Sequence, residues 1–460
     1  MHNEGEPLKG AGQWMLGSTL AFCGFTGGMC LVWPSIIFPK VQEGEVDFSF
    51  TEFEASCVAS FLYVGEMLAN IPTSYLQTAF GRRRVLLFAI TFQMGAWPVI
   101  YFLRKVWAIL LARILMGIWV GFYATCCPVF MSEISPYWAR GRIIGQLKIM
   151  DLCGFLFQTA VGTFASYGTV AIVSYFFIFV LYVALLNIPE SVYFLVKNHQ
   201  HVKAERNLQW LRGNEDVKDE LARIEHYLEI QMSRKRGFME IFRWPPSRKA
   251  FFQSLGLSFV QKCSAFTALS SYASFLVPDS WVSAKHYPIV WTSITLICLI
   301  LSVSVVDLVD RKVLLQISTT GTAVFTLLVA LWFYIEENTS FDMSTTLWVP
   351  MVGLSLQSAF YAFGFLYLPV VYQAEVFAMN VKAKAGSMLG FIRFAVAAGT
   401  VQIFIPLQRN IGHSSNLFIY FFSAFCGCFI CINIIETRNK NLELIQRLLE
   451  GRDTEPLSFA

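Results

Sequence analysis

Besides Arg113 and charged residues at their ends, five charged residues lie within long apolar stretches of this 460-residue sequence. Ionised groups in such surroundings are costly to bury, and they usually mark a pathway or a binding site. The five are Glu66, Lys148, Asp151, Lys262 and Arg393. Lys148 and Asp151 are three residues apart, so on a helix they share one face and can pair, and Gln158 extends that face. Because three cations accompany two carboxylates, the interior is predicted to carry a net positive charge.

Three interpretations of these charges stay open. In the first they form a buried structural network, with Lys148 beside Asp151 and Glu66 beside Lys262 or Arg393. In the second the excess positive charge attracts an anionic solute, since the planar fork of an arginine suits a carboxylate. In the third the same groups serve as hydrogen-bond donors to a neutral sugar.

The elements that position these residues follow from composition. Hydrophobic residues make up 55% of the chain and charged residues 14%, against about 25% charged residues in soluble domains. Apolar stretches of about 20 residues, the length that spans a bilayer core as a helix, recur along the chain. We therefore predict an all-α membrane protein with twelve transmembrane helices. They are expected near 14–38, 55–79, 85–103, 106–130, 143–166, 169–188, 250–277, 287–309, 313–335, 346–376, 384–408 and 415–436.

Basic residues concentrate on alternate loops between these stretches. By the positive-inside rule the basic side is cytoplasmic, which places both termini inside. The predicted organisation is a cytoplasmic N-terminus (1–13), a six-helix bundle (14–188), a cytoplasmic helical linker (189–249), a second six-helix bundle (250–436) and a cytoplasmic tail (437–460). Short amphipathic helices are expected in the linker at Ala204–Arg212 and Asp216–Arg234. The sequon Asn338-Thr339-Ser340 falls on an outer loop, where a glycan can be attached, and the plasma membrane is the expected location.

The two halves repeat a pattern of charges. Gly81-Arg82-Arg83 follows the second span, and a stretch from Asp307 to Lys312 that includes Arg311 follows the eighth. Glu133 precedes Arg140 by seven residues, and Glu375 precedes Lys382 by seven. The same spacing at equivalent places predicts a duplicated six-helix unit, a pattern typical of transporters with a central site.

Those motifs resemble the sugar porter family of the major facilitator superfamily, and within it the insect trehalose and glucose facilitators. Further motifs carry the resemblance: Arg113-x3-Gly117-x3-Gly121, Pro128 to Glu133, Pro189-Glu190-Ser191, Leu211-Arg212-Gly213 and Glu375-Val376-Phe377. The resemblance implies the major facilitator fold and alternating access, in which two bundles rock around a central site. It also implies a cytoplasmic gate made of Arg82, Arg83, Glu133, Arg140, Asp307, Arg311, Glu375 and Lys382.

The seventh span carries neutral polar residues that suit a sugar. Gln261, Ser264, Thr267, Ser271 and Ser274 would form one polar stripe on a continuous helix. Tyr272 stands where the resembled family has a gating aromatic, whereas Lys148, Lys262 and Arg393 replace neutral side chains of that family. The candidate substrate-binding residues are therefore Gln261, Thr267, Lys148, Lys262, Arg393, Gln158 and Tyr272, with Glu66 and Asp151 in the buried charge network.

The most favoured function is facilitated transport of a sugar, a hexose or a trehalose-like disaccharide. A carrier of a small organic anion and a non-transporting solute sensor are the alternatives. The first span (14–38) lacks an acidic residue, so facilitated transport is the simpler expectation, and proton coupling through Glu66 or Asp151 stays the alternative. All six His lie outside the spans, and no nucleotide-binding loop or activated nucleophile is recognisable. We therefore expect no enzyme activity, cofactor, metal or nucleic-acid partner, and a monomer whose partners are a small solute and the lipid bilayer.

Overall fold

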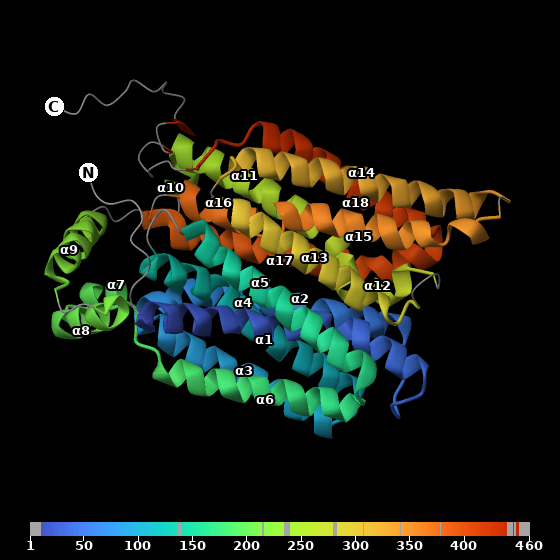
Figure 1. Ribbon diagram of the computed structural model, residues 1–460, viewed down its shortest axis with the longest axis horizontal. Coiled ribbons are helices and arrows are strands. Elements are labelled where there is room, and N and C mark those ends of the chain that lie inside the picture. Colours follow the sequence, from blue (N-terminus) through green and yellow to red (C-terminus); the bar gives the residue numbers. More distant parts are fainter. Residues whose placement is uncertain are drawn as a thin grey trace.

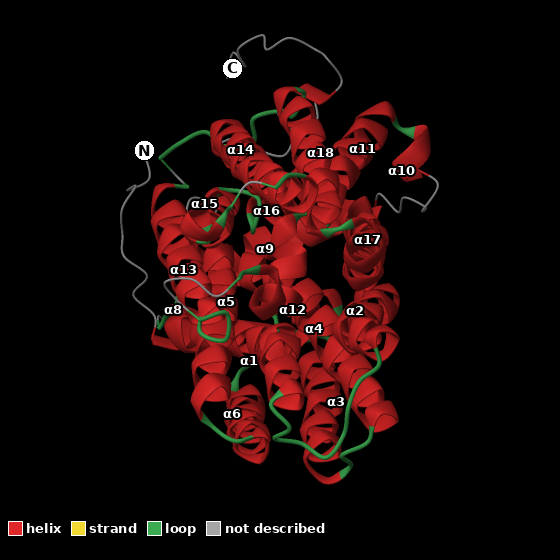
Figure 2. Ribbon diagram, turned by 90° about the vertical axis from the view of Figure 1, so that its right-hand side faces the viewer, coloured by secondary structure: helices red, strands yellow, loops and turns green. Residues whose placement is uncertain are grey.

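The computed structural model describes residues 11–135, 140–213, 216–233, 240–278, 283–306, 308–340, 342–377, 379–438, 445, 448 and 449. Within these ranges the side chains of 11, 140, 141, 227, 230–233, 240 and 379–383 are not described. The described secondary structure is helical, and Figure 2 shows it as red helices joined by green loops.

Six long helices form the first half of the molecule. They are α1 (Ala11–Gln42), α2 (Glu52–Phe80), α3 (Arg82–Phe102), α4 (Val106–Ile134), α5 (Arg140–Phe164) and α6 (Tyr167–Asn187). Helix α1 packs along α5 and α2 along α4, while α3 contacts both α4 and α6. These helices gather on one side of the molecule in both ribbon views (Figures 1 and 2).

The second half is a similar group on the other side. It contains α11 (Pro245–Lys262), α12 (Ala265–Leu276), α13 (Tyr287–Val305), α14 (Arg311–Asn338), η1 (Ser344–Thr346), α15 (Trp348–Phe363), α16 (Leu368–Val376), α17 (Met379–Ile411) and α18 (His413–Ile432). The two halves meet where α2 packs on α17, α5 on α13 and α1 on α12. The centre of the molecule is thus bounded by helices from both halves.

Ten helical segments in the described part of the chain are long and apolar enough to cross a membrane. Helix α2 and the α11–α12 pair run alongside them in the bundle (Figure 1) and bring the passages to the twelve that the sequence predicts. The chain is therefore an all-α, multi-pass membrane protein.

Two of the predicted spans are broken helices. The span predicted at 250–277 is interrupted at Cys263 and Ser264, and Ser264 has an extended backbone with φ −136° and ψ 155°. The span predicted at 346–376 is interrupted between Gly364 and Tyr367. The expectation of one continuous polar stripe from Gln261 to Ser274 was therefore wrong, because the helical period is lost at Ser264.

Four short helices connect the halves: α7 (Val192–Lys197), α8 (His201–Arg212), α9 (Lys218–Ser233) and α10 (Glu240–Arg243). Helices α8 and α9 match the two predicted linker helices, whereas α7 and α10 were not predicted. Helix α8 ends at Gly213, whose left-handed backbone (φ 64°) is the usual glycine stop signal. Helices α7, α8 and α9 lie beyond one end of the bundle, on the left in Figure 1.

Candidate functional site

The predicted pair in α5 is present. Lys148 Nζ lies 2.6 Å from Asp151 Oδ2, and Tyr123 in α4 donates a hydrogen bond of 3.0 Å to Asp151 Oδ1. Both carboxylate oxygens of Asp151 are thus satisfied, although its side chain is only 9% exposed. The Lys148 side chain keeps 27% exposure, so solvent reaches its ammonium. The pair therefore contributes no net charge to the centre.

Lys262 is the last residue of α11, and its ammonium lies between helices of the two halves. Its Nζ is 5.7 Å from the ring centroid of Tyr63 in α2 and 5.4 Å from that of Phe394 in α17. Ring faces attract a cation and offset part of the cost of removing it from water. The end of a helix also favours positive charge, because its last carbonyls have no intrahelical partners. The break after Lys262 therefore gives this lysine two sources of stabilisation.

Glu66 and Arg393 complete the central cluster. Glu66 is 1% exposed and Arg393 is 9% exposed. Lys262 exerts the strongest attraction on the Glu66 carboxylate, followed by Lys148 and Arg393, while Asp151 repels it. The guanidinium carbon of Arg393 lies 4.8 Å from the ring centroid of Phe394. Glu66 Oε1 and Arg393 Nε have no hydrogen-bond partner in the structure, so the cluster has unused hydrogen-bonding capacity.

The neutral polar residues near the break have partly structural roles. Gln261 Nε2 donates to the carbonyls of Phe365 (2.7 Å) and Leu366 (3.2 Å), within the other broken span. Tyr361 in turn donates to the carbonyl of Gln261 at 2.7 Å. The two interruptions thus provide hydrogen bonds to each other's backbone carbonyls. Within a membrane such backbone groups need a partner in the protein, because no water is available to them. Gln261 Oε1 remains without a partner.

Two other predicted site residues lie apart from this contact. Thr267 is buried in the first turn of α12, with its hydroxyl 3.5 Å from that of Ser264. Gln158 accepts a hydrogen bond of 3.1 Å from Ser174 in α6, and its Nε2 has no partner. The contact with α6 draws Gln158 away from the cations of the second half, even though it shares a helix face with Asp151.

Aromatic rings from both halves line the centre, and the sequence reasoning did not identify them. Phe266 stacks on Tyr361 with ring centroids 4.7 Å apart and planes within 15°. It also lies 5.3 Å from Trp291 in α13, and Phe155 of α5 contacts the same tryptophan ring at 5.5 Å. The face of an aromatic ring can pack on the apolar face of a sugar ring, as it packs here on other aromatic rings.

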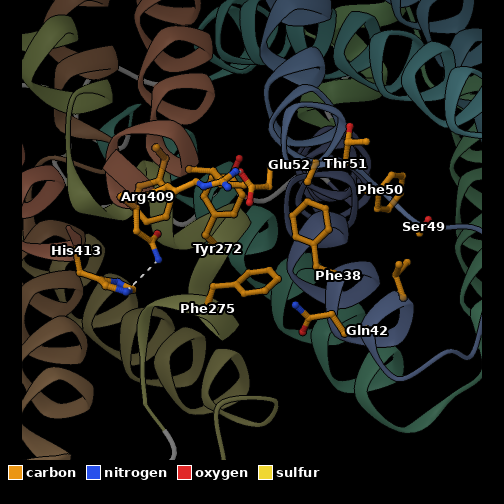
Figure 3. Close-up of a pocket in the computed structure, with 15 residues that line it drawn as sticks. Phe38, Gln42, Ser49, Phe50, Thr51, Glu52, Tyr272, Phe275, Arg409 and His413 are labelled. Carbon is orange, nitrogen blue, oxygen red and sulfur yellow. Dashed lines mark hydrogen bonds and ion pairs between the residues drawn. The ribbon is translucent and has the colours of Figure 1, made fainter. Parts of the chain in front are cut away.

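Tyr272 belongs to a stack of three rings. Its ring lies parallel to that of Phe38 in α1 (6.0 Å, 8°) and to that of Phe404 in α17 (4.8 Å, 12°). Its hydroxyl donates to the carbonyl of Val401 at 3.2 Å. All three rings line a cavity of about 590 Å³, which Figure 3 shows between α1 and the second half. Arg393 lies eleven residues before Phe404 on α17, roughly 16 Å along the helix, so the stack lies between this vestibule and the charge cluster.

Two exposed ion pairs join the halves beside the vestibule. Lys285 Nζ lies 2.9 Å from Glu43 Oε1, and Arg409 Nη1 lies 2.6 Å from Glu52 Oε2. Glu52 and Arg409 are among the residues that line the cavity (Figure 3). Exposed pairs of this kind contribute little energy individually, so they supplement the closure that the ring stack provides.

At the opposite end, the predicted gate residues form an ion pair in the first half. Arg82 Nη2 lies 2.7 Å from Glu133 Oε1, with both side chains mostly buried, and Ser191 donates to Glu133 Oε2. Glu190 accepts hydrogen bonds from the backbone N–H groups of Arg82 (2.8 Å) and Arg83 (3.2 Å) and so caps α3. The Arg83 guanidinium donates to the backbone carbonyls of Leu185 and Leu186 at the end of α6.

The second half repeats this arrangement. Arg311 forms an ion pair with Glu375 and donates to Thr437 Oγ1 at 3.2 Å, while Glu436 accepts from the backbone N–H of Lys312 at 2.9 Å. Glu436-Thr437 therefore repeats Glu190-Ser191, a signal that was present in the sequence but not used. The side chains of Arg140 and Lys382, and the whole of Asp307, lie outside the described residues.

Asn338, the predicted glycosylation residue, is the last residue of α14. Its side chain is exposed, and its Nδ2 donates to the carbonyl of Tyr334 at 3.0 Å. Helix α14 begins at Arg311, in the gate just described, so Asn338 lies at the other end of the bundle.

Comparisons with known proteins cover nearly the whole chain. The sequence profile of the family described as "Sugar (and other) transporter" matches residues 13–449. "Sugar transporter ERD6-like 7" of Arabidopsis thaliana is 25% identical over 441 residues, which cover 95% of this chain and 94% of the relative. "Facilitated trehalose transporter Tret1" of Polypedilum vanderplanki is 24% identical over 427 residues, covering 90% and 84% respectively.

Solved structures share the fold. The proton:xylose symporter XylE bound to 6-bromo-6-deoxy-D-glucose superposes with a TM-score of 0.78 at 19% identity, covering 95% of this chain and all of that chain. A partially occluded, inward-open form of XylE from E. coli gives a TM-score of 0.73 at 19% identity, with 92% and 99% covered. The chain accordingly shares the fold of these XylE structures.

Proposed function

Because the chain belongs to the sugar (and other) transporter family, we propose that it is a facilitative carrier that moves a hexose or a trehalose-like sugar across a membrane. The observation that carries this proposal is the stack of Tyr272 on Phe38, which joins the two halves in the wall of the vestibule. Farther along α17 lies Arg393, whose Nε has no hydrogen-bond partner among the described residues. A solute that crosses must pass this stack, which fits a gated carrier better than an open channel.

Alternating access follows from the contacts at the two ends. The stack of Phe38 on Tyr272 and the two exposed ion pairs hold the halves together beside the vestibule. The Arg82–Glu133 and Arg311–Glu375 pairs lie within their own halves at the other end. When the halves rock, the outer contacts break, and the gate residues become free to contact the opposite half. Binding of the solute lowers the free energy of the conformation in which both ends are closed. The carrier can then pass between its outward-open and inward-open conformations.

The same proposal assigns the two helix bundles, the linker and the side of the membrane that each segment faces. Residues 14–188 and 250–436 are the two rocking bundles, 189–249 is a cytoplasmic linker, and 1–13 and 437–460 are cytoplasmic ends. The Arg-rich gate and α7–α10 then face the cytoplasm, while the vestibule and Asn338 face outward. We place the carrier in the plasma membrane as a monomer.

Transport is proposed to be downhill rather than proton-driven. Helix α1 contains no Asp or Glu, so it offers no acid that could bind a proton in each cycle. Asp151 is paired with Lys148 and accepts a hydrogen bond from Tyr123, so both of its carboxylate oxygens are engaged by the protein itself. No energy source other than the solute gradient is then required.

Uptake into proteoliposomes tests this function. The purified protein is reconstituted, and radiolabelled glucose and trehalose are offered separately, with protein-free liposomes as the background. The proposal expects saturable entry of at least one sugar that stops when the inside and outside concentrations are equal. If glucose, trehalose and the acidic sugar glucuronate all fail to enter through protein whose fold is verified by its thermal transition, sugar transport is wrong. Accumulation above the outside concentration, driven by an imposed pH gradient, would contradict the downhill mechanism.

A further inference from the structure

The central cluster carries one positive charge that the protein does not balance. Lys148 and Asp151 neutralise each other at 2.6 Å. Two cations, Lys262 and Arg393, then share the single carboxylate of Glu66. An unbalanced cation away from bulk water is expensive, so a site that carries one is poised to accept an anion.

The hydrogen bonds of the cluster also leave a charged donor available to a ligand. Arg393 is 9% exposed, and its Nε donor has no acceptor. The ammonium of Lys262 lies against the faces of Tyr63 and Phe394, which offset charge but accept no strong hydrogen bond. Buried donors of charged groups are normally satisfied. Both side chains come from the second half, on α11 and α17, two helices that pack against each other.

Arg113 shows what a structural arginine looks like in this protein. Its Nε donates to the carbonyl of Val58 at 2.8 Å and its Nη1 to that of Cys30 at 2.6 Å. Its guanidinium carbon also lies 5.9 Å from the ring centroid of Trp33. The Nε and Nη1 atoms of Arg113 thus have backbone acceptors, whereas Arg393 Nε has no partner among the described residues.

We propose that the central site takes a monosaccharide that bears a carboxylate, such as a uronate, and that Lys262 and Arg393 bind its carboxylate. This inference rests on the proposed sugar transport and specifies its substrate class. With the ligand bound, Lys262 and Arg393 are balanced by Glu66 and the ligand, so the occupied cluster is neutral. The rings of Phe266 and Trp291 then face the sugar, and the unpartnered Oε1 of Gln261 accepts from one of its hydroxyls.

Transport of such a solute moves one negative charge, so its final distribution depends on membrane potential. Proteoliposomes with a potassium gradient and valinomycin are given radiolabelled glucuronate or glucose. At 100 mV, inside positive, glucuronate is expected to accumulate about 50-fold over the outside concentration, from the work of moving one charge. Glucose is expected to equilibrate whatever the potential.

The outcomes separate this inference from the proposed function. If glucose enters and glucuronate neither enters nor competes with it, the charged-substrate inference is wrong and sugar transport stands. If neither solute enters through folded protein, the proposed function itself fails. Accumulation of glucuronate that follows the potential supports both.

Substitutions test whether Lys262 and Arg393 bind the carboxylate of the solute. Lys262→Gln and Arg393→Gln are each expected to lower the ratio of apparent affinities for glucuronate over glucose at least tenfold, roughly the loss of one charge-assisted hydrogen bond. Arg393→Lys should retain part of the preference. Lys203→Gln, an exposed cation on α8, is the matched control and should leave the ratio unchanged. Equal weakening of both solutes by Lys262→Gln and Arg393→Gln would overturn the assignment, because a structural role predicts no selectivity.

Discussion

The ring of Phe38 in α1 stacks on the ring of Tyr272 in α12, with centroids 6.0 Å apart and planes within 8°. The first ring belongs to one half of the molecule and the second to the other. Tyr272 also stacks on Phe404, but that contact lies within the second half. Opening of the vestibule must therefore break the contact with Phe38 while Tyr272 stays attached to α17.

Removal of the Tyr272 ring is expected to favour the outward-open state. An aromatic pair contributes about 0.5–1.5 kcal/mol beyond area burial, so Tyr272→Ala should raise the open population about two- to tenfold. Cys57 on α2 is a suitable reporter, because it is 5% exposed and contacts Gln402 of α17. Its rate of labelling by a membrane-impermeant maleimide, with the other cysteines replaced, should rise accordingly. Tyr272→Phe keeps the ring and should label at the rate of the parent protein, and an unchanged rate in Tyr272→Ala would show that the stack is not the closure.

Loss of the Arg82 charge should destabilise the protein and leave Glu133 without its cation. Both side chains are mostly buried, at 14% and 13% exposure, so Arg82→Gln should lower the free energy of unfolding by about 1–3 kcal/mol after allowance for this exposure. The double variant Arg82→Gln/Glu133→Gln should recover much of the loss. Thermal unfolding in detergent measures both effects. Arg84→Gln, at an exposed neighbouring position, is the control. If Arg84→Gln destabilised the protein as much as Arg82→Gln, the ion pair of Arg82 with Glu133 would not be the source of the stability.

Glu45, in the loop that follows α1, should make the outer face sensitive to acid. Burial alone would raise the pKa of Glu45, but hydrogen bonds from Lys40 Nζ (2.7 Å) and the Tyr167 N–H (2.9 Å), with the charge of Lys40, hold it below its ordinary value of 4.5. A depressed carboxyl pKa contributes stability that is present above the unfolded pKa and is lost as pH falls through the folded pKa.

Glu45→Gln should therefore destabilise the protein at neutral pH, and this difference should shrink as the pH falls from the ordinary glutamate value of 4.5 toward about 3. Thermal unfolding of both proteins across this range gives the comparison. Convergence of the two melting temperatures on acidification is expected. A difference that stays constant with pH would mean that the ionised form of Glu45 has no special role.

Glycosylation of Asn338 tests the proposed orientation. The asparagine is exposed at the end of α14, and only an outer loop meets the glycosylation machinery. Expression in eukaryotic cells should give a band that moves faster on gels after endoglycosidase treatment. Asn338→Gln should migrate with the deglycosylated band and be insensitive to the enzyme. A glycan introduced by a new sequon in α8 instead would reverse the proposed topology.

The course of the twelve passages was predictable because hydrophobic length alone decides where a helix can cross. The break at Cys263 and Ser264 was not, since it depends on a partner distant in sequence. Gln261 satisfies the carbonyls of Phe365 and Leu366, and neither helix would be interrupted at low cost without the other. The hydropathy of a sequence does not show which distant residues will form such hydrogen bonds.

Part of the candidate site could likewise be predicted from the sequence, and part needed the structure. The Lys148–Asp151 pair follows from spacing on one helix, so the sequence sufficed. The surroundings of Lys262 needed the structure, because Tyr63 and Phe394 come from helices that only the fold brings together. By contrast, Glu436-Thr437 repeats Glu190-Ser191 in plain sequence, and a closer comparison of the two halves would have found the second capping residue.

Countertransport is the measurement that tests alternating access most directly. Proteoliposomes are preloaded with a high concentration of unlabelled glucose and diluted into a trace of labelled glucose, or of the solute found to enter first. A single site exposed in turn to each side predicts that the label enters faster than into empty vesicles and rises transiently above its outside concentration. Entry at the same rate into loaded and empty vesicles, with no transient accumulation, would contradict a carrier and indicate a pore.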